Sequence, residues 1–326
     1  MLGPLLFSGH SACIGKGERK RMAIRLDKLV AERFGLSRRG AQEAIRNGRI
    51  DLAGARCDEP GREVEANVAL EFFPSRPRAR KVRSRLAVLY EDPHLLIVDK
   101  PAGLLTLPTA QHEHDTLLER ATRFLALRYG GRPYVGIVHR IDKDTSGALI
   151  LARSPGVQRA LQALLKAHDV ERRYVALVEG TVVRQSGTIR LALVTDRGDL
   201  RRGVAREPGE GRKAVTHFRV LERFGSVATL LECWLETGRT HQIRIHLAAQ
   251  GHPVVGERVY RPRSLGAPKV SFHRQALHAQ TLGFRHPITG AMVHAEAPLP
   301  HDFEQLLAEV RQRVAGRRSG GWRGRT

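Results

Sequence analysis

The sequence predicts an α+β protein with a small N-terminal domain and a large domain built around a mixed or antiparallel sheet. The chain has 326 residues, of which 41% are hydrophobic, and this suffices for two domains with real cores. Helical patterns separate only some of the strand-like apolar runs, so the strict alternation of a parallel α/β fold is missing. The strand-like runs are residues 95–98, 148–152, 174–178 and 228–235, and the helical patterns are residues 116–130 and 155–169.

The small domain is expected over residues 22–73. Apolar residues between Leu26 and Phe34 fall on one helical face, and Gly35 is suited to end that helix. Ser37 can cap a second helix that runs to Asn47. A short β segment with Ala53-Gly54 as its turn follows. The pattern is typical of a helix-turn-helix followed by a hairpin.

The charge of the chain indicates a polyanionic partner. Lys and Arg number 55 against 33 Asp and Glu, which gives a formal net charge of +22 and a pI near 11.1. Any single arginine is as well explained by a solvated surface, but basic residues cluster on the two short helices and beside them. The candidate residues for binding this polyanion are Arg25, Lys28, Arg38, Arg39, Arg46 and Arg49.

Three further segments lie outside the two domains. Residues 1–21 are expected to be disordered or to precede the true start, because Met22 stands directly before the patterned region. Residues 74–85 are rich in basic side chains and predict a linker, and residues 311–326 predict a basic, disordered tail. The large domain therefore spans residues 86–310.

Composition also restricts the compartment and the metal chemistry. The three cysteines, Cys13, Cys57 and Cys233, lie far apart, which argues against a disulfide framework or a zinc ribbon and fits a reducing cytoplasm. No apolar run approaches the roughly 18 residues that a membrane span needs. The segment His112–Asp115 lacks the partner motif of a zinc deaminase, so we interpret it as a solvated loop. We expect no metal and no cofactor.

The most informative stretch for chemistry is the polar loop HRIDKDTSG, residues 139–147. Apolar, strand-like residues enter and leave this loop, which places its polar side chains at the edge of a sheet. An ordinary turn, in which Asp142, Asp144 and their neighbours bond the backbone, is the competing interpretation. A kinase catalytic loop is excluded, because a Gly-rich phosphate loop and a DFG segment are absent.

A second constellation lies at residues 236–260. A strand ends at Glu236, a turn follows, and a short helix is expected from Gln242 to Ala249. Arg244 lies about 100° round this helix from the core-facing Ile243, so it can lean over the helix edge. Beside a carboxylate, such a guanidinium would form a directional ion pair; alone, it would be a surface arginine.

Two resemblances follow from these motifs. RLDKLVAE with SRRGAQEAIRNGRIDLAG resembles the alpha-L RNA-binding domain, which implies binding to folded RNA. The large domain resembles the RluA-type pseudouridine synthases over about residues 88–300, which implies their catalytic fold around a mixed, largely antiparallel sheet. The motifs that carry the second resemblance are DKPAGLL (99–105), HRIDKDTSGALILA (139–152), RRYVALVEG (172–180), GRTHQIRIHLAAQGHPVVGE (238–257) and RQALHAQTLGFRHPITG (274–290).

The second resemblance implies a role for each of four residues. Asp142 matches the essential aspartate, and Arg140 matches the arginine that enters the duplex as the target base is flipped out. Tyr174 matches the tyrosine that stacks on the uracil, and Arg244 matches the arginine paired with the aspartate. One departure is Leu107-Pro108, where His-Pro is commoner.

The implied reaction is the isomerisation of uridine to pseudouridine in structured RNA, with large-subunit ribosomal RNA favoured over transfer RNA. The reaction needs neither an oxidant nor an external group. One carboxylate suffices, whether it attacks the sugar, adds to the base or abstracts a proton, and the sequence leaves these routes open. The alternatives are a non-catalytic RNA-binding assembly factor and an RNA-directed hydrolase. We expect a cytoplasmic monomer.

Overall fold

A computed structural model describes residues 23–57, 59–76, 86–109, 115–197 and 201–319. The chain forms two compact units, one comprising residues up to 84 together with 123–133, and the other comprising residues 85–122 and 134–326. Helix α3 (Leu117–Tyr129) spans the boundary between them. The expected leader, residues 1–21, and most of the expected linker lie outside the described residues. None of the described helices is long and apolar enough to cross a membrane.

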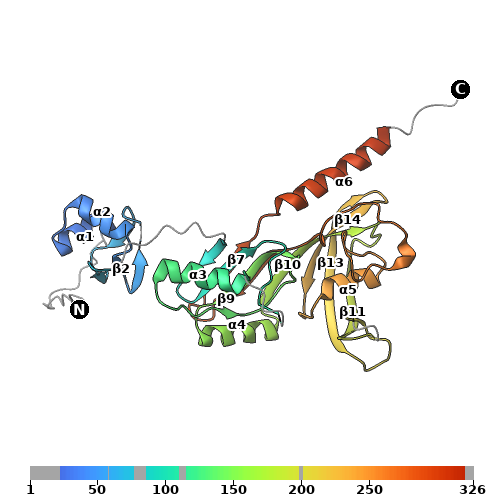
Figure 1. The fold of residues 1–326 in the computed structure, drawn as a ribbon, viewed down its shortest axis with the longest axis horizontal. Helices are drawn as coiled ribbons and strands as arrows, with labels where there is room; N and C mark the ends of the chain where they lie inside the picture. Colours follow the sequence, from blue (N-terminus) through green and yellow to red (C-terminus); the bar gives the residue numbers. More distant parts are fainter. Residues whose placement is uncertain (1–22, 58, 77–85, 110–114, 198–200, 320–326) are drawn as a thin grey trace, which may run out of the picture. The chain divides into compact units, whose positions relative to one another are not determined.

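The small unit has the helix-turn-helix and hairpin that the sequence predicts (Figure 1). Gly35 ends the first helix in a left-handed conformation, and the Ser37 hydroxyl caps the second by accepting from the Gly40 amide. Leu26, Val30 and Ile45 form its core and are fully buried. Its elements are β1 (Ala23–Arg25), α1 (Leu26–Phe34), α2 (Arg38–Arg46), β2 (Ile50–Leu52), β3 (Ala55–Cys57), β4 (Glu63–Glu65) and β5 (Leu70–Phe72).

The small unit extends beyond the boundary expected at residue 73. Arg76 forms a bidentate ion pair with Asp51, with nitrogen–oxygen distances of 2.5 and 2.8 Å, and also donates to the Gly48 carbonyl. Its guanidinium lies 3.8 Å from the centre of the Phe73 ring. The first residues of the predicted linker therefore belong to the domain, because a partner distant in the sequence holds them there.

The large unit is built on one mixed sheet of 11 strands, in which β15 and β9 form the one parallel pair and every other described pairing is antiparallel. The strand order is β12-β11-β13-β14-β10-β15-β9-β7-β6, with β16 on β15 and β8 on β9. This confirms the α+β prediction. The strands are β6 (Ala87–Glu91), β7 (Leu95–Lys100), β8 (Gly136–Ile137), β9 (Ser146–Ala152), β10 (Val170–Glu179), β11 (Ser186–Val194), β12 (Gly203–Val204), β13 (Arg212–Phe224), β14 (Ala228–Leu235), β15 (Leu277–Arg285) and β16 (Met292–Glu296).

Helices pack against this sheet at two places that matter for the cleft. Helix α4 (Pro155–Ala167) is capped by Ser154 and buries Val157 and Leu161 in the core beneath β9. Helix α5 (Gln242–Ala249) lies against β11, β12 and β13, and nearly all of its residues are buried (Figure 1). A short 3-10 turn covers Arg263–Leu265.

The C-terminal segment corrects one prediction. Helix α6 spans His301–Ser319, so residues 311–319 are helical rather than part of a disordered tail from 311 to 326. Phe303, Leu307 and Val310 are buried, and Arg311 continues the contact through a bidentate ion pair with Glu222 of β13. The basic composition of residues 311–326 predicted disorder because it does not indicate the contact of this helix with β13. Residues 320–326 lie outside the described part.

The parallel junction of β9 and β15 sets the position of the polar loop that precedes β9. At this junction Ser146 lies beside His278, and the Ser146 hydroxyl is 2.9 Å from the imidazole Nδ1. Gly147 follows with a φ of +118°, and a Cβ there would lie 2.1 Å from the Ala279 carbonyl oxygen. Only glycine allows the two backbones to approach so closely.

Replacing Gly147 with alanine should destabilise the protein by about 3 kcal/mol or more, because the added methyl group meets rigid backbone. Denaturant unfolding of the purified variant measures this free energy. Gly156→Ala is the matched control, since a Cβ at that helical position would meet nothing within 4 Å. We expect that control to be neutral or slightly stabilising, as alanine favours helices. Equal stability of the two variants would contradict the expected clash.

Candidate active site

The loop between β8 and β9 carries Asp142 and is held by bonds to its backbone. The Thr106 hydroxyl donates to the Ile141 carbonyl over 3.2 Å. His139 accepts the Ile150 amide hydrogen at Nε2 over 3.1 Å. Burial, with a smaller contribution from the charge of Arg172, lowers the pKa of His139 to about 3, so the imidazole is neutral and remains an acceptor. The loop is thus more than an ordinary surface turn.

A buried lysine supports the same loop from below. Lys100, the last residue of β7, is fully buried and donates to three carbonyls, those of Pro101, Leu104 and Lys143, at 2.7 to 3.0 Å. Burial lowers the pKa of its ammonium group to about 7, while the charges of Asp144 and Asp142 oppose that shift. Three donors meeting three acceptors tie the loop after β7 to the loop before β9.

Arg244 joins two carboxylates from different parts of the chain. Its Nε and Nη2 donate to both oxygens of the fully buried Glu257 over 2.7 and 2.9 Å, and its Nη1 donates to Asp142 Oδ2 over 3.0 Å. Burial alone would lower the pKa of Arg244, but the bonds and charges of Glu257 and Asp142 outweigh it and raise that pKa. The backbone amides of Val259 and Tyr260 also donate to Glu257.

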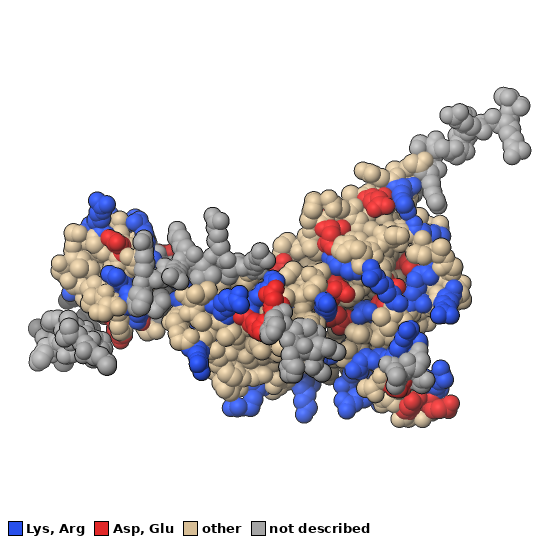
Figure 2. Space-filling view, in the orientation of Figure 1, with Lys and Arg blue, Asp and Glu red and all other residues tan. Residues whose placement is uncertain are grey.

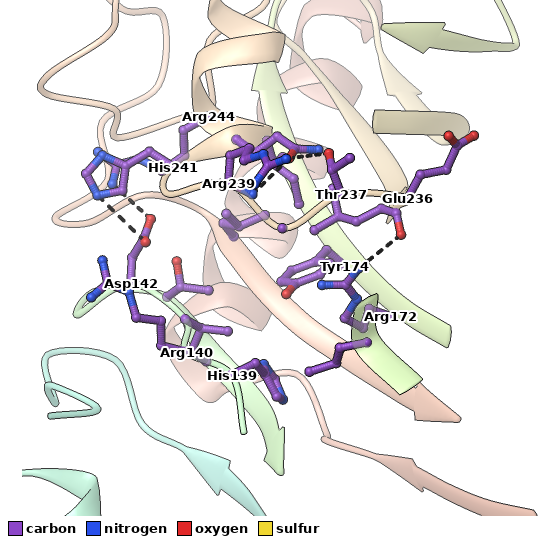
Figure 3. A pocket seen from close by; sticks show the side chains of 18 of the residues that line it. His139, Arg140, Asp142, Arg172, Tyr174, Glu236, Thr237, Arg239, His241 and Arg244 are labelled. Atoms are coloured by element: carbon purple, nitrogen blue, oxygen red, sulfur yellow. Dashed lines mark hydrogen bonds and ion pairs between the residues drawn. The ribbon is translucent and has the colours of Figure 1, made fainter. Parts of the chain in front are cut away.

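His241 faces Asp142 on the same side as Arg244 (Figure 3). Its Nε2 lies 3.7 Å from Asp142 Oδ1, and its Nδ1 lies 2.5 Å from the Tyr260 hydroxyl oxygen. Burial lowers the pKa of His241, although Asp142 pulls in the opposite direction. The residue has a positive φ of 59° at the start of α5. This backbone places the ring over the carboxylate.

Tyr174 and Arg140 complete the predicted set. Tyr174 lies on β10, its side chain is 8% exposed, and burial raises the pKa of its hydroxyl. Arg140 is exposed, two residues before Asp142 in the same loop. Together with Asp142 and Arg244, both line one cleft of about 690 Å³, which runs between the loop, β10 and the start of α5 (Figure 3). Four residues from three segments of the chain, between positions 140 and 244, thus share one cleft.

Matches to known proteins identify the family of this chain. The family model described as RNA pseudouridylate synthase matches residues 94–249, and that of the S4 domain matches residues 24–70. The ribosomal large subunit pseudouridine synthase D of Xanthomonas campestris is 41% identical over 88% of this chain and 89% of its own length. Its Escherichia coli counterpart is 36% identical over 89% of this chain and 92% of its own length.

The chain belongs to the RNA pseudouridine synthases. Solved structures agree at the level of the fold: human RNA pseudouridylate synthase domain containing 4 has a TM-score of 0.56 at 23% identity and covers 69% of this chain and 93% of its own. Human RNA pseudouridylate synthase domain containing 1 has a TM-score of 0.54 at 24% identity, with 71% of this chain and 97% of its own covered.

In this pseudouridine synthase, three residues at or behind the cleft were not indicated by the sequence: His241 lines the cleft, whereas Glu257 holds Arg244 and Lys100 holds the loop of Asp142 without lining it. Glu257, His241 and Lys100 were not selected from the sequence, although all three stand within the quoted motifs. A buried arginine is usually stabilised by a buried acid, but the sequence does not reveal which acid pairs with Arg244. Arg244 is 13 residues from Glu257 and 102 residues from Asp142 in the sequence, and no local sequence pattern predicts contacts between residues so far apart.

The candidate RNA-binding residues of the small unit have different surroundings. Lys28, Arg38, Arg39 and Arg46 are exposed. Arg25 forms an ion pair with the buried Asp27, and Arg49 is half-buried and donates to the Arg76 carbonyl over 3.2 Å. Their contact with RNA stays a prediction. His112–His114 lie outside the described residues, and Asp115 pairs with Arg120. Within the described ranges, no group of three His, Cys, Asp or Glu side chains is arranged to hold a metal.

Replacing Arg244 with lysine should slow pseudouridine formation at saturating enzyme by about 100-fold or more, because one ammonium group cannot bridge Glu257 and orient Asp142 together. Single-turnover conversion of uridine in ribosomal RNA transcripts measures the rate. Arg261→Lys is the matched control, since Arg261 forms a comparable bidentate pair with Glu179 away from the cleft, at 2.7 and 2.9 Å. A similar loss in both variants would mean that only stability, not orientation, had changed.

Proposed function

We propose that this pseudouridine synthase converts specific uridines of large-subunit ribosomal RNA to pseudouridine, with Asp142 as the essential carboxylate. The relatives named for that RNA align with both the small and the large domain. The observation that carries the residue assignment is the ion pair of Asp142 with Arg244 inside the cleft, 3.0 Å long. It fixes one oxygen of the carboxylate and leaves the group half-buried at the cleft wall.

The reaction balances without any further reactant. The bond between the ribose C1′ and the uracil N1 breaks, the base turns, and a bond between C1′ and C5 forms. The hydrogen on C5 leaves as a proton, and N1 gains a proton. Asp142 can attack C1′, add to the ring or remove a proton from the sugar, and each route needs a carboxylate held at the glycosidic bond. Arg244 and His241 supply that orientation.

The target base must leave its stack before it reaches Asp142. Unstacking costs a few kcal/mol, and we assign the compensation to two residues that line the cleft. Arg140, exposed beside the opening, takes the position that the base leaves. Tyr174, on the cleft wall, offers a flat ring on which uracil stacks. Burial keeps the Tyr174 hydroxyl protonated, because its pKa is raised.

The small domain is proposed as a second RNA contact. Arg38, Arg39 and Arg46 all lie on α2, and their side chains are exposed. Lys and Arg side chains are spread over the visible face of each unit (Figure 2). Arg25, Lys28 and Arg49 belong to the same proposed surface. We also propose that the enzyme acts as a monomer in the cytoplasm, a reducing compartment that suits the described cysteines, Cys57 and Cys233, which are free thiols.

Asp142→Asn should abolish the reaction, since the amide neither attacks nor accepts a proton as a carboxylate does. The measurement is release of tritium from ribosomal RNA transcripts labelled at C5 of uridine, a hydrogen that leaves only when pseudouridine forms. Asp144→Asn in the same loop is the control and should retain activity, because Asp144 does not line the cleft.

A second experiment maps pseudouridine in a deletion strain that carries either the wild-type gene or Asp142→Asn. Equal pseudouridine maps from the two strains would refute the assignment of Asp142. If the Asp142→Asn strain instead lost pseudouridine only at transfer-RNA sites, transfer RNA would be the substrate in place of ribosomal RNA.

Changing Arg38, Arg39 and Arg46 together to glutamine should weaken RNA binding and lower the slope of log affinity against log salt by about 2 to 3, since each phosphate contact contributes about 0.7 to 0.9. Filter binding of ribosomal RNA transcripts at 50 to 200 mM salt tests this. The corresponding triple lysine variant keeps the charge and should keep the slope. An unchanged slope in the glutamine variant would remove α2 from the RNA-binding surface.

A further inference from the structure

Arg172 stands on the wall of the catalytic cleft without an assigned role. It lies two residues before Tyr174 on β10, and both side chains therefore point to the same face of the sheet. Both line the cleft, with Arg172 beside Tyr174 and farther from Asp142 (Figure 3). The Arg172 side chain is only 8% exposed. The neighbouring Arg173 points to the opposite face and pairs with Glu171 and Glu232.

The guanidinium of Arg172 lacks the partners that a buried cation normally has. Its Nε has no hydrogen-bond partner among the described residues, and its Nη2 makes only a long bond of 3.3 Å to the Leu235 carbonyl. No carboxylate in the described part of the chain forms an ion pair with it. The other two buried arginines differ: Arg244 pairs with Glu257 and Asp142, and Arg274 pairs with Asp302 through two bonds of 2.7 and 2.9 Å.

The cleft that Arg172 lines holds more cationic side chains than carboxylates, and its carboxylates, Asp142 and Glu236, pair with Arg244 and His217 rather than with Arg172. Lys166 from the end of α4 and Arg140 line the same cleft. The positive charge of Arg172 lowers the pKa of His139 and favours the ionised form of Tyr174, but burial has the larger effect on both groups and raises the pKa of Tyr174 overall. Gly238 borders the guanidinium, and a Cβ there would lie 3.0 Å from Nη1, so the absence of a side chain leaves that nitrogen open to the cleft.

A buried charge without a counter-charge is unfavourable unless a ligand supplies one. The planar guanidinium fork matches the oxygens of a phosphate group, and the RNA substrate of this enzyme carries one phosphodiester group per nucleotide. We propose that Arg172 binds a phosphate oxygen of the RNA strand that carries the target uridine, and so holds that strand while the base lies against Tyr174. The inference rests on the proposed function, because it requires RNA in the cleft. A uracil carbonyl is also an acceptor, but it carries no formal charge to neutralise the cation.

The test compares Arg172→Gln with Arg173→Gln, which removes the same charge from the opposite face of the same strand. Single-turnover tritium release from C5-labelled ribosomal RNA transcripts is measured against enzyme concentration at several salt concentrations. For Arg172→Gln we expect a half-saturating concentration about tenfold higher, a salt slope reduced by about one, and a saturating rate within threefold of wild type. Arg172→Lys should restore the slope, and Arg173→Gln should leave all three values unchanged.

A second arm identifies the atom that is bound. Synthetic RNA carrying the mapped uridine is made with a neutral methylphosphonate at each phosphate near that uridine in turn. One such replacement should weaken binding to the wild type about tenfold and have no further effect on Arg172→Gln. A lowered saturating rate with an unchanged salt slope would overturn the proposal in favour of contact with the base.

Thermal unfolding separates binding from a purely structural role. Because the charge is buried and unpaired in the free protein, Arg172→Gln should keep or raise the melting temperature. A lower melting temperature together with unchanged RNA binding would refute the proposal. Failure of the proposed function itself has a different signature, since the wild type would then release no tritium from any ribosomal RNA transcript.

Discussion

The bridge that Arg244 forms between Glu257 and Asp142 is the interaction on which the catalytic cleft depends. A guanidinium buried in α5 is stable only if its charge is neutralised, and the fully buried Glu257 does this with two bonds. The remaining nitrogen then has a fixed direction, toward Asp142. The carboxylate that we propose as catalytic therefore takes its orientation from Arg244, which its buried ion pair with Glu257 holds in place.

The rest of the large unit brings the two ends of this bridge together. The loop of Asp142 is held by three groups: Lys100 at the end of β7, the Thr106 hydroxyl, and the neutral His139 of the loop itself, which accepts the amide hydrogen of Ile150 in β9. The parallel junction of β9 and β15 holds the end of that loop, and it requires glycine at position 147. Strain and burial are thus concentrated around one polar loop, whose precise placement the chemistry needs.

The cleft also combines neutral and charged groups in a definite arrangement. Burial keeps His139 and Tyr174 uncharged, while the charged side chains that line the cleft are those of Asp142, Glu236, Arg140, Lys166, Arg172, Arg239 and Arg244. An RNA strand brings one negative charge per nucleotide to this surface. A cleft with excess cationic groups around one fixed carboxylate attracts the backbone while it keeps the acid directed at the sugar and base.

The sequence by itself determined the fold class, the helix-turn-helix of the small domain and four of the cleft residues, because these depend on local periodicity, capping and contiguous motifs. Gly35, Ser37 and the hairpin turn at Ala53-Gly54 are as predicted. Tertiary structure alone decided that Glu257 holds Arg244 and His241 faces Asp142, that Arg76 belongs to the small unit, and that α6 continues to Ser319. Each of these rests on a contact between residues distant in the chain, and no local pattern records which distant partner a buried charge or a basic helix will find.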